Sequence, residues 1–389
     1  MTIIEKSDDL AALCRRLGQE PYVTVDTEFI RERTYWPRLC LLQLAGRDEA
    51  VAVDPLAPGL ELGPLFELLA RPEVLKVFHA ARQDIEIFHY LSEQIPTPLF
   101  DTQVAAMVCG FGEAASYETL AAKLANARID KSLRFTDWAR RPLTQRQVRY
   151  ALSDVTHLRV IYEKLQARLE KSGRSAWLGE EMAVLSDPAT YAPHPGEAWR
   201  RLKSRSRDRR FLGILREVTA WRELEAQKRD VPRNRVLRDA ALIEIAAHPP
   251  TSPEELARVR GMPEGLARGK AGERIMAAAR RGLALPEDQL PQAERGRPPS
   301  GVGPLVELLK VLLKAKCEGH DVAQKLVANS ADLERIAAED EAPVPALKGW
   351  RREIFGDAAL KLKRGELALA ASGREVALID LVGSGGGSG

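Results

Sequence analysis

The chain has 389 residues, of which 45% are hydrophobic and 29% charged, as is ordinary for a soluble globular protein with two or three domains. No segment approaches the ~20 apolar residues of a membrane span, and acids stand near the N-terminus where a signal peptide needs an apolar run, so we exclude a membrane protein and expect a cytoplasmic one. The net charge of +3 is unevenly distributed along the chain. Residues 1–190 hold 23 basic and 27 acidic side chains, whereas residues 199–238 hold 14 basic and 5 acidic ones. An acidic half joined to a basic half suits a polyanionic substrate held near metal ions.

Strand and helix patterns alternate through the first half of the chain. Strand-like runs, rich in β-branched and aromatic residues, lie at residues 22–29, 40–44, 50–53 and 75–78. Helical patterns lie at residues 8–17 and 83–91 and dominate from residue 102 onward. The early strands are joined by short loops, which favours an antiparallel meander, and the later strand–helix alternation favours parallel pairing. We therefore predict an α/β fold with a mixed sheet flanked by helices.

Two acids stand on the first long strand. Asp26 and Glu28 are two residues apart, so their side chains project to the same face of that strand. Two like charges side by side on an apolar strand repel each other and are costly to bury. Either the strand lies at a solvated edge of the sheet, or a cation holds the pair.

A helix predicted from residue 144 carries the next candidates. Thr144 and Gln147 have the spacing of a capping box, and a helical pattern of apolar residues runs on to residue 165. Tyr150 and Asp154 are four residues apart, so both side chains lie on one face of this helix. Read alone, they are a packing tyrosine and a solvated acid.

Together with Asp84, at the beginning of the predicted helix 83–91, the chain offers four carboxylates from three segments. Phosphodiester hydrolysis needs an activated water and a cation at the departing oxyanion, and two divalent metals about 3.5–4 Å apart supply both. Carboxylate oxygens select Mg²⁺ or Mn²⁺. Without metal the four acids repel one another, so at least one of them should have a raised pKa.

Residues 25–29, 78–84 and 150–155 resemble the three exonuclease motifs of the bacterial ribonuclease D family, which belongs to the DEDD superfamily. Residues 33–44 and 130–143 are similar to that family as well, so the resemblance covers nearly all of residues 1–185. It implies an RNase H-like fold, two bound divalent metal ions, and 3′→5′ hydrolysis of RNA from a free 3′ end with release of 5′-mononucleotides. By position, it implies metal ligands at Asp26, Glu28, Asp84 and Asp154, with Asp26 shared between the ions.

The resemblance also gives Tyr150 a role, orienting or deprotonating the attacking water beside Asp154. One branch of the superfamily has a histidine where this chain has Arg149, so the tyrosine branch is favoured. Phe29 either stacks on the terminal base or belongs to the core, and His79 either contacts the sugar or packs. Asp101 we expect to be a helix N-cap and not a ligand.

The second half has only helical patterns, separated by turn-rich segments. Residues 211–283 resemble the HRDC domain shared by ribonuclease D and RecQ-type helicases, and residues 304–380 weakly resemble a second copy. We therefore expect two all-α domains after the exonuclease domain. The predicted boundaries are an exonuclease domain at 1–185, a linker at 186–198, an HRDC domain at 199–284, a linker at 285–303, an HRDC-like domain at 304–381 and a Gly/Ser tail at 382–389.

The basic surplus of the first helical domain predicts a nucleic-acid surface. Its candidate phosphate contacts, which would position RNA without reading its sequence, are Arg222, Arg229, Arg233 and Arg235. The alternative is a solvated helix face with intrahelical ion pairs such as Glu225–Arg229.

These observations predict a monomeric exoribonuclease that trims RNA precursors such as those of tRNA. A 3′→5′ DNA exonuclease stays open, because nothing in the sequence identifies a contact to a 2′-hydroxyl. A catalytically silent RNA-binding scaffold is the other alternative, and the presence of all four acids and the tyrosine argues against it. No phosphate-binding loop of the Gly-x-x-x-x-Gly-Lys type occurs, so we disfavour a fused helicase.

Overall fold

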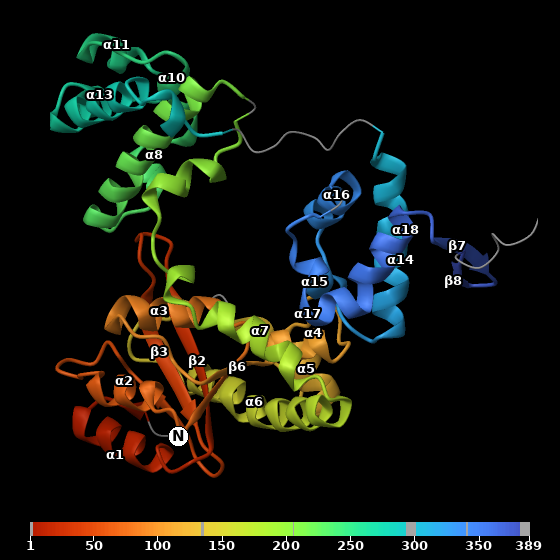
Figure 1. Ribbon diagram of the computed structural model, residues 1–389. Coiled ribbons are helices and arrows are strands. Elements are labelled where there is room, and N and C mark those ends of the chain that lie inside the picture. The colour runs from red at the N-terminus through yellow and green to blue at the C-terminus, as the bar shows by residue number, and fades with distance from the viewer. Residues whose placement is uncertain (1–2, 134–135, 205, 293–300, 340, 382–389) are drawn as a thin grey trace, which may run out of the picture. The chain divides into compact units, whose positions relative to one another are not determined.

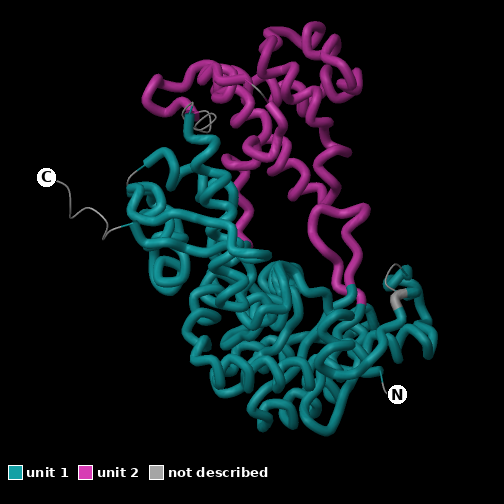
Figure 2. The backbone as a smooth tube through the Cα atoms, turned by 90° about the vertical axis from the view of Figure 1, so that its right-hand side faces the viewer, with its two compact units in different colours: residues 1–28, 41–190, 297–389 teal, residues 29–40, 191–296 magenta. Residues whose placement is uncertain are grey.

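The computed structural model describes residues 3–133, 136–204, 206–292, 301–339 and 341–381. The chain divides into two compact units, which Figure 2 shows in different colours. The first unit comprises residues 1–28, 41–190 and 297–389, and the second comprises residues 29–40 and 191–296. Among the described helices, none has both the length and the apolar character that a membrane crossing requires.

A mixed sheet of six strands carries the candidate acids of the first long strand (Figure 1). The strands are β1 Ile3–Ile4, β2 Tyr22–Ile30, β3 Arg38–Ala45, β4 Ala50–Val53, β5 Leu75–Phe78 and β6 Leu99–Asp101, in the spatial order β1-β4-β3-β2-β5-β6. β3 and β4 pair antiparallel, whereas β5 pairs parallel with both β2 and β6. The predicted mixed sheet is therefore confirmed. The short strands β1 and β6 were not predicted, because two or three residues show no periodicity.

Nine helical segments accompany this sheet in the described part of residues 3–190, and eight of them are given first. They are α1 Ser7–Leu17, α2 Gly63–Ala70, α3 Arg82–Ser92, α4 Thr102–Val108, α5 Tyr117–Leu124, α6 Gln145–Ser172, α7 Ser175–Leu185 and the short η2 Pro188–Thr190. A further short turn of helix, η1, covers Lys131–Leu133. The helices predicted at 8–17 and 83–91 correspond to α1 and α3.

Helix α6 is the long element that carries Tyr150 and Asp154. It begins with the predicted capping box: Thr144 Oγ1 accepts a hydrogen bond from the Gln147 amide, and Gln147 Oε1 accepts one from the Thr144 amide. It ends at Gly173, whose left-handed φ of 68° closes the last turn without a Cβ penalty. Its buried face, which includes Ala151, Val155 and Leu158, packs against β4 and β5. The apolar spacing read from the sequence thus brings α6 onto the sheet.

The C-terminal segment of the first unit packs against the helices of residues 102–185. Its elements are α14 Gly303–Gly319, α15 Gln324–Val327, α16 Ser330–Ala338, η5 Pro345–Leu347, α17 Gly349–Arg351, η6 Arg352–Gly356, α18 Asp357–Lys363, β7 Leu367–Ser372 and β8 Glu375–Asp380. Trp350 stacks on Trp177 of α7 with ring centroids 4.5 Å apart, and Arg351 pairs with Glu180 at 2.5 Å and with Glu181. The antiparallel β7–β8 hairpin corrects the expectation that this segment is all α-helical. Gly373, at a φ of 63°, supplies the turn that joins its strands.

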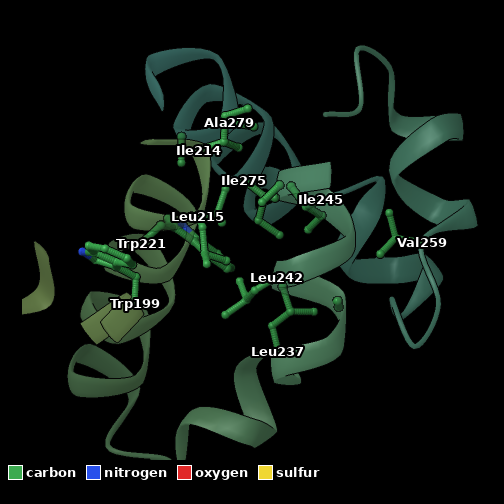
Figure 3. Close-up of a cluster of buried hydrophobic side chains, with 14 of the residues drawn as sticks. Trp199, Ile214, Leu215, Trp221, Leu237, Leu242, Ile245, Val259, Ile275 and Ala279 are labelled. Atoms are coloured by element: carbon green, nitrogen blue, oxygen red, sulfur yellow. The ribbon is translucent and has the colours of Figure 1, made fainter. Parts of the chain in front are cut away.

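The second unit is helical apart from residues 29–40. Its elements are η3 Pro195–Arg201, α8 Arg209–Arg229, α9 Arg233–Val236, α10 Asp239–Ala247, α11 Pro253–Arg258, α12 Glu264–Ala267, α13 Lys270–Leu283 and η4 Glu287–Gln289. Figure 3 shows apolar side chains from these helices gathered in one core, among them Trp199, Leu215, Leu242 and Ile275. Residues 293–300 of the second predicted linker and the tail at 382–389 lie outside the described residues.

Residues 31–37, which connect β2 to β3, join this helical core through Tyr35. Its ring is buried in the core cluster, and its hydroxyl donates a hydrogen bond to Glu223 of α8. Asp230, which ends α8 at a φ of 46°, accepts hydrogen bonds from the Tyr35 and Trp36 amides at 3.0 Å each. The connection between two strands of the sheet is thus a part of the helical unit.

Candidate active site

Strand β2 presents Asp26 and Glu28 from the middle of the sheet, because β3 and β5 are its two neighbours. The alternative of a solvated edge strand is therefore wrong. Val23 and Val25 are fully buried, whereas Asp26 and Glu28 are only partly buried, as the alternation of a strand dictates. The two acids consequently point together to an accessible face.

Asp154 of α6 meets this pair. One carboxylate oxygen each from Asp26, Glu28 and Asp154 lies within 4.8 Å of the other two. The Tyr150 hydroxyl, one turn earlier on α6, donates a hydrogen bond to the Asp154 carboxylate. Asp154 Oδ1 is buried and has no hydrogen-bond partner among the described residues. Three of the four predicted ligands are thus brought to one point.

Asp84 stands beside this group without belonging to it. It lies in the first turn of α3, is 7% exposed, and accepts a short hydrogen bond from the Thr27 hydroxyl. The sequence pattern does not single out Thr27, which lies between Asp26 and Glu28 on β2. The charge of Asp26 nevertheless raises the pKa of Asp84, after the larger effect of burial, so the fourth acid is within electrostatic reach.

The turn that positions Asp84 is held by Asp101, the last residue of β6. The Asp101 carboxylate accepts hydrogen bonds from the amides of Ala80 and Ala81 at 3.0 and 2.8 Å. It also caps α4 through the amide of Gln103 at 2.7 Å, which confirms the predicted N-cap. Ala80 has a left-handed φ of 57°, and the hydrogen bond that its amide donates to Asp101 holds it there. Asp101 thus fixes the chain just before α3.

Burial raises the pKa of all four acids, and the charges of neighbouring acids raise it further for Asp26, Glu28 and Asp84. Burial, and then the charges of Asp26, Asp154 and Asp84, raises the pKa of Glu28 to about 10. Burial raises the pKa of Asp154 to about 7, although the hydrogen bond from Tyr150 opposes this. For Asp26 the cause is burial followed by the charge of Asp154. Such a cluster is stable in its ionised form only when positive charge is added.

The residues present therefore fit a divalent cation. They offer hard carboxylate oxygens close together, a buried oxygen without a partner, and a repulsion that a cation would relieve. The carboxylates meet this description without any nitrogen or sulfur ligand, which favours Mg²⁺ or Mn²⁺ over zinc.

A cavity of about 390 Å³ opens over the acids. Besides Asp26, Glu28, Tyr150 and Asp154, its lining includes His79, Gln103, Ser116, Tyr117 and Glu118. His79 Nδ1 lies 3.0 Å from the Thr102 hydroxyl, and burial lowers the pKa of His79 to about 4, so the imidazole is neutral at pH 7. The space is large enough for a nucleotide beside the metal ligands.

Sequence reasoning missed Tyr117, the first residue of α5. Its hydroxyl donates hydrogen bonds to the Asp154 carbonyl and, at 3.2 Å, to the Ser153 carbonyl, and its ring contacts His79 edge-on with centroids 5.5 Å apart. No local pattern around residue 117 indicates this, since the contacts come from residues 36 and more positions away. Phe29 lies in the second unit, and its stacking on a base stays a prediction.

The four arginines that the sequence predicts as phosphate contacts differ in exposure and in their partners. Arg229 and Arg235 are exposed, which is compatible with the expectation. Arg222 is 3% exposed and donates to the Leu237 carbonyl at 2.9 Å and to Asp239 at 2.6 Å, so the structure corrects its placement on an RNA-facing surface. Arg233 forms a two-pronged pair with Glu223, with Nε–Oε2 at 2.5 Å and Nη2–Oε1 at 2.6 Å.

Comparison with known proteins gives a consistent result. A family model described as a 3′-5′ exonuclease matches residues 1–170, and the HRDC domain model matches residues 211–278. The chain is 56% identical to the ribonuclease D of Granulibacter bethesdensis over 381 residues, which are 97% of this chain and 96% of the relative. It is 54% identical to the ribonuclease D of Gluconacetobacter diazotrophicus over 375 residues, 96% of this chain and 95% of the relative.

A solved structure is similar over the same length. The crystal structure of Escherichia coli RNase D, described as an exoribonuclease involved in structured RNA processing, matches with a TM-score of 0.80 at 30% identity, covering 94% of this chain and 98% of the other. The catalytic core of RRP6 from Trypanosoma brucei shares the fold, with a TM-score of 0.55 at 23% identity over 73% of this chain and 80% of the other. The expected fold class is thus confirmed.

Proposed function

The chain belongs to the ribonuclease D family, and from this premise we propose that Asp26, Glu28, Asp84 and Asp154 hold two divalent ions, Mg²⁺ or Mn²⁺. The protein is a metal-dependent 3′→5′ exoribonuclease. What we add is the assignment of its site to these residues of this chain. The observation that carries the assignment is the approach of one carboxylate oxygen each from Asp26, Glu28 and Asp154 to within 4.8 Å of the other two, in a cluster where Asp154 Oδ1 is buried and has no hydrogen-bond partner among the described residues.

Asp26 is the ligand that we place between the two ions. The charge of Asp26 contributes to the raised pKa of Glu28 and of Asp84. The charge of Asp154 in turn raises the pKa of Asp26. The charge of Asp26 is the largest of those acting on Glu28 and also the largest acting on Asp84, so Asp26 is the acid best placed to be shared between two ions. When bound, the ions activate a water molecule and stabilise the oxyanion that leaves the phosphorus.

Tyr150 holds and orients the attacking water in this proposal. Its hydroxyl already bonds to Asp154, so a water beside that carboxylate lies within reach of the phenol oxygen. His79, neutral at pH 7, can donate to or accept from a sugar hydroxyl without adding charge. The lining residues Gln103 and Ser116 offer further polar groups for the terminal nucleotide.

The natural substrates that we propose are structured RNA precursors with a free 3′ end, such as those of tRNA. The relative from Escherichia coli, an exoribonuclease involved in structured RNA processing, supports this class of substrate. The exposed Arg229 and Arg235 would contact phosphates without reading sequence. We also propose a monomer that acts in the cytoplasm, with the domain boundaries that the sequence predicts.

One experiment tests the assignment of substrate and site. Purified protein is incubated with 5′-labelled RNA and with DNA of the same sequence, each with a 3′-hydroxyl or a 3′-phosphate, in Mg²⁺, Mn²⁺ or EDTA. We expect stepwise shortening of the 3′-hydroxyl RNA only, in either metal. Asp26→Ala should abolish it, and Asp48→Ala, at an exposed turn of the same unit, should not. Equal shortening of DNA would favour the DNA exonuclease, and cleavage by Asp26→Ala would refute the metal assignment.

A further inference from the structure

A second cavity, of about 340 Å³, lies wholly within the helical unit. One wall is formed by Arg31, Thr34 and Tyr35, from the connection between β2 and β3. The opposite wall comes from the helices and includes Arg201, Arg222 and Arg233. Its place in the fold is well defined, because the Tyr35 ring is packed in the core and the Arg233 guanidinium stacks over that ring at 4.7 Å.

The lining carries more positive than negative charge. Four arginines face this cavity, but only two acids, Glu223 and Asp239. Burial raises the pKa of Glu223, but the hydrogen bonds from Arg233 and Tyr35 and the charges of Arg233 and Arg201 outweigh burial, so Glu223 stays ionised at pH 7. Arg233 neutralises Glu223, and Arg222 pairs with Asp239 at 2.6 Å. The lining therefore holds two more arginines than acids.

Arg222 also has a donor without an acceptor. Its side chain is 4% exposed, and its Nη1 is committed to the Leu237 carbonyl and to Asp239. Its Nε is buried and has no hydrogen-bond partner among the described residues. A buried N–H without an acceptor is unfavourable, and more so on a charged group. An oxygen of a bound anion would satisfy it.

We propose that this cavity binds a phosphate group of the RNA backbone. The inference deepens the proposed function, since it rests on RNA being the substrate and names the place where the helical unit holds it. Arginine suits this task because its planar donors match the geometry of phosphate oxygens. The volume accommodates a phosphate together with part of its sugar. Arg222 is buried and so is not a surface contact, but it would bind the phosphate from inside the cavity.

Arg201 is the residue to change first, because it is exposed and its loss should leave the fold intact. The affinity of the full-length protein for a fluorescent single-stranded RNA is measured in EDTA, which prevents hydrolysis, over a range of salt concentrations. Arg201→Ala should weaken binding about tenfold, the loss expected for one charge-assisted hydrogen bond. It should also lower the slope of log K against log salt by about 0.7, the value for one phosphate of a single strand. The matched control is Arg280→Ala, at an exposed position of the same unit outside this cavity, which should change neither quantity.

Two further variants separate phosphate binding from a structural effect. Arg201→Lys keeps the charge and should retain most of the salt slope while losing part of the affinity. Asp239→Asn removes a half-exposed acid from the lining and should tighten RNA binding, the opposite of a damaged fold. Thermal melting of each variant checks that the unit is folded.

The outcomes are distinguishable from those of the proposed function. Unchanged affinity and salt slope for Arg201→Ala, or weaker binding by Asp239→Asn, would overturn the phosphate site even if wild-type protein shortens RNA in Mg²⁺. Conversely, a wild-type protein that binds RNA with the predicted dependence on Arg201 but hydrolyses none of it would leave this site standing and refute the metal assignment.

Discussion

The Thr27 hydroxyl donates a hydrogen bond to Asp84 Oδ1. Thr27 lies between Asp26 and Glu28 but points to the other face of β2, where it is 7% exposed. One strand therefore supplies two carboxylates to one face and, from the other, a donor that holds the acid of α3. The bond opposes the effect of burial on the Asp84 pKa, because it favours the ionised carboxylate that a metal needs.

Thr27→Val tests this relationship, since valine keeps the shape and removes the hydroxyl. Asp84 would lose its donor, and we expect metal affinity or hydrolysis to fall about 10–100-fold, as for other residues that orient metal ligands. The metal dependence of the rate is the measurement. Thr27→Ser, which restores a hydroxyl, should recover most of the activity; if valine and serine behave alike, the hydrogen bond has no such role.

Tyr150→Phe should slow hydrolysis more than it weakens metal binding. The phenol hydroxyl is lost, and with it the hydrogen bond that lowers the pKa of Asp154, whereas no carboxylate is removed. We expect kcat to fall about 10²–10⁴-fold, the usual contribution of a group that orients or moves a proton. The metal Kd, from melting temperature against Mg²⁺ concentration, should change far less. Tyr162→Phe, on the same helix but facing Tyr22 and Phe100, is the control, and a rate equal to wild type in both variants would remove Tyr150 from the reaction.

Features set by neighbouring residues were predictable from the sequence. The capping box at Thr144 is local chemistry, and the two-residue and four-residue spacings put Asp26 with Glu28 and Tyr150 with Asp154 on shared faces. That the two faces meet was an inference from resemblance, because no spacing rule joins β2 to α6. The structure shows directly that the two faces meet, because one oxygen each of Asp26, Glu28 and Asp154 lies within 4.8 Å of the other two.

Features set by distant contacts were not predictable. The sequence around Arg222 shows only a basic helix, and its burial depends on Leu237 and Asp239, which fold back against it. Tyr35 reads as an aromatic residue in a loop, and its place follows from Glu223, which is 188 residues away. A charge count indicated that the helical unit is basic, but not which arginines are paired inside it. The polar partners of a buried side chain come from the fold.

The pH dependence of stability should differ between metal-free and metal-bound protein. Glu28 and Asp154 have their pKa raised in the folded chain, to about 10 and about 7, from ordinary values of 4.5 and 3.8. Their contribution to the stability of the folded chain is complete below their ordinary pKa values. It is lost as the pH rises, because the unfolded chain releases protons that the folded chain retains. Metal-free protein should therefore melt about 3–6 °C lower at pH 7 than at pH 5.

Excess Mg²⁺ should reverse this trend, because the metal binds the deprotonated carboxylates. The rise in Tm on adding Mg²⁺ should be larger at pH 8 than at pH 5. The double variant Glu28→Gln, Asp154→Asn should show a smaller metal effect and a weaker pH trend, because only Asp26 and Asp84 keep their raised pKa. A wild-type Tm that is flat from pH 5 to 7 in EDTA would contradict the idea that these acids are held under mutual repulsion.

Arg351 should stabilise the packing of the C-terminal helices of the first unit against α7. Its guanidinium is 11% exposed and bonds to Glu180, to Glu181 and, at 2.7 Å, to the Leu326 carbonyl, beside the Trp350–Trp177 stack. Burial raises the pKa of Glu181 and the charge of Arg351 opposes this, so Arg351→Met would leave a partly buried acid without its partner. We expect a loss of about 2–4 kcal/mol of stability in this unit, with faster hydrogen exchange and proteolysis in residues 301–381.

Arg352→Met is the control one residue along the chain. Arg352 pairs with Asp357 at 2.8 Å, but both side chains are more than half exposed, so water and salt screen the pair. Its loss should barely change hydrogen exchange. If the two methionine variants prove equally stable, the charged contacts at Arg351 do not hold this segment, and the stacked tryptophans and apolar packing must do so alone.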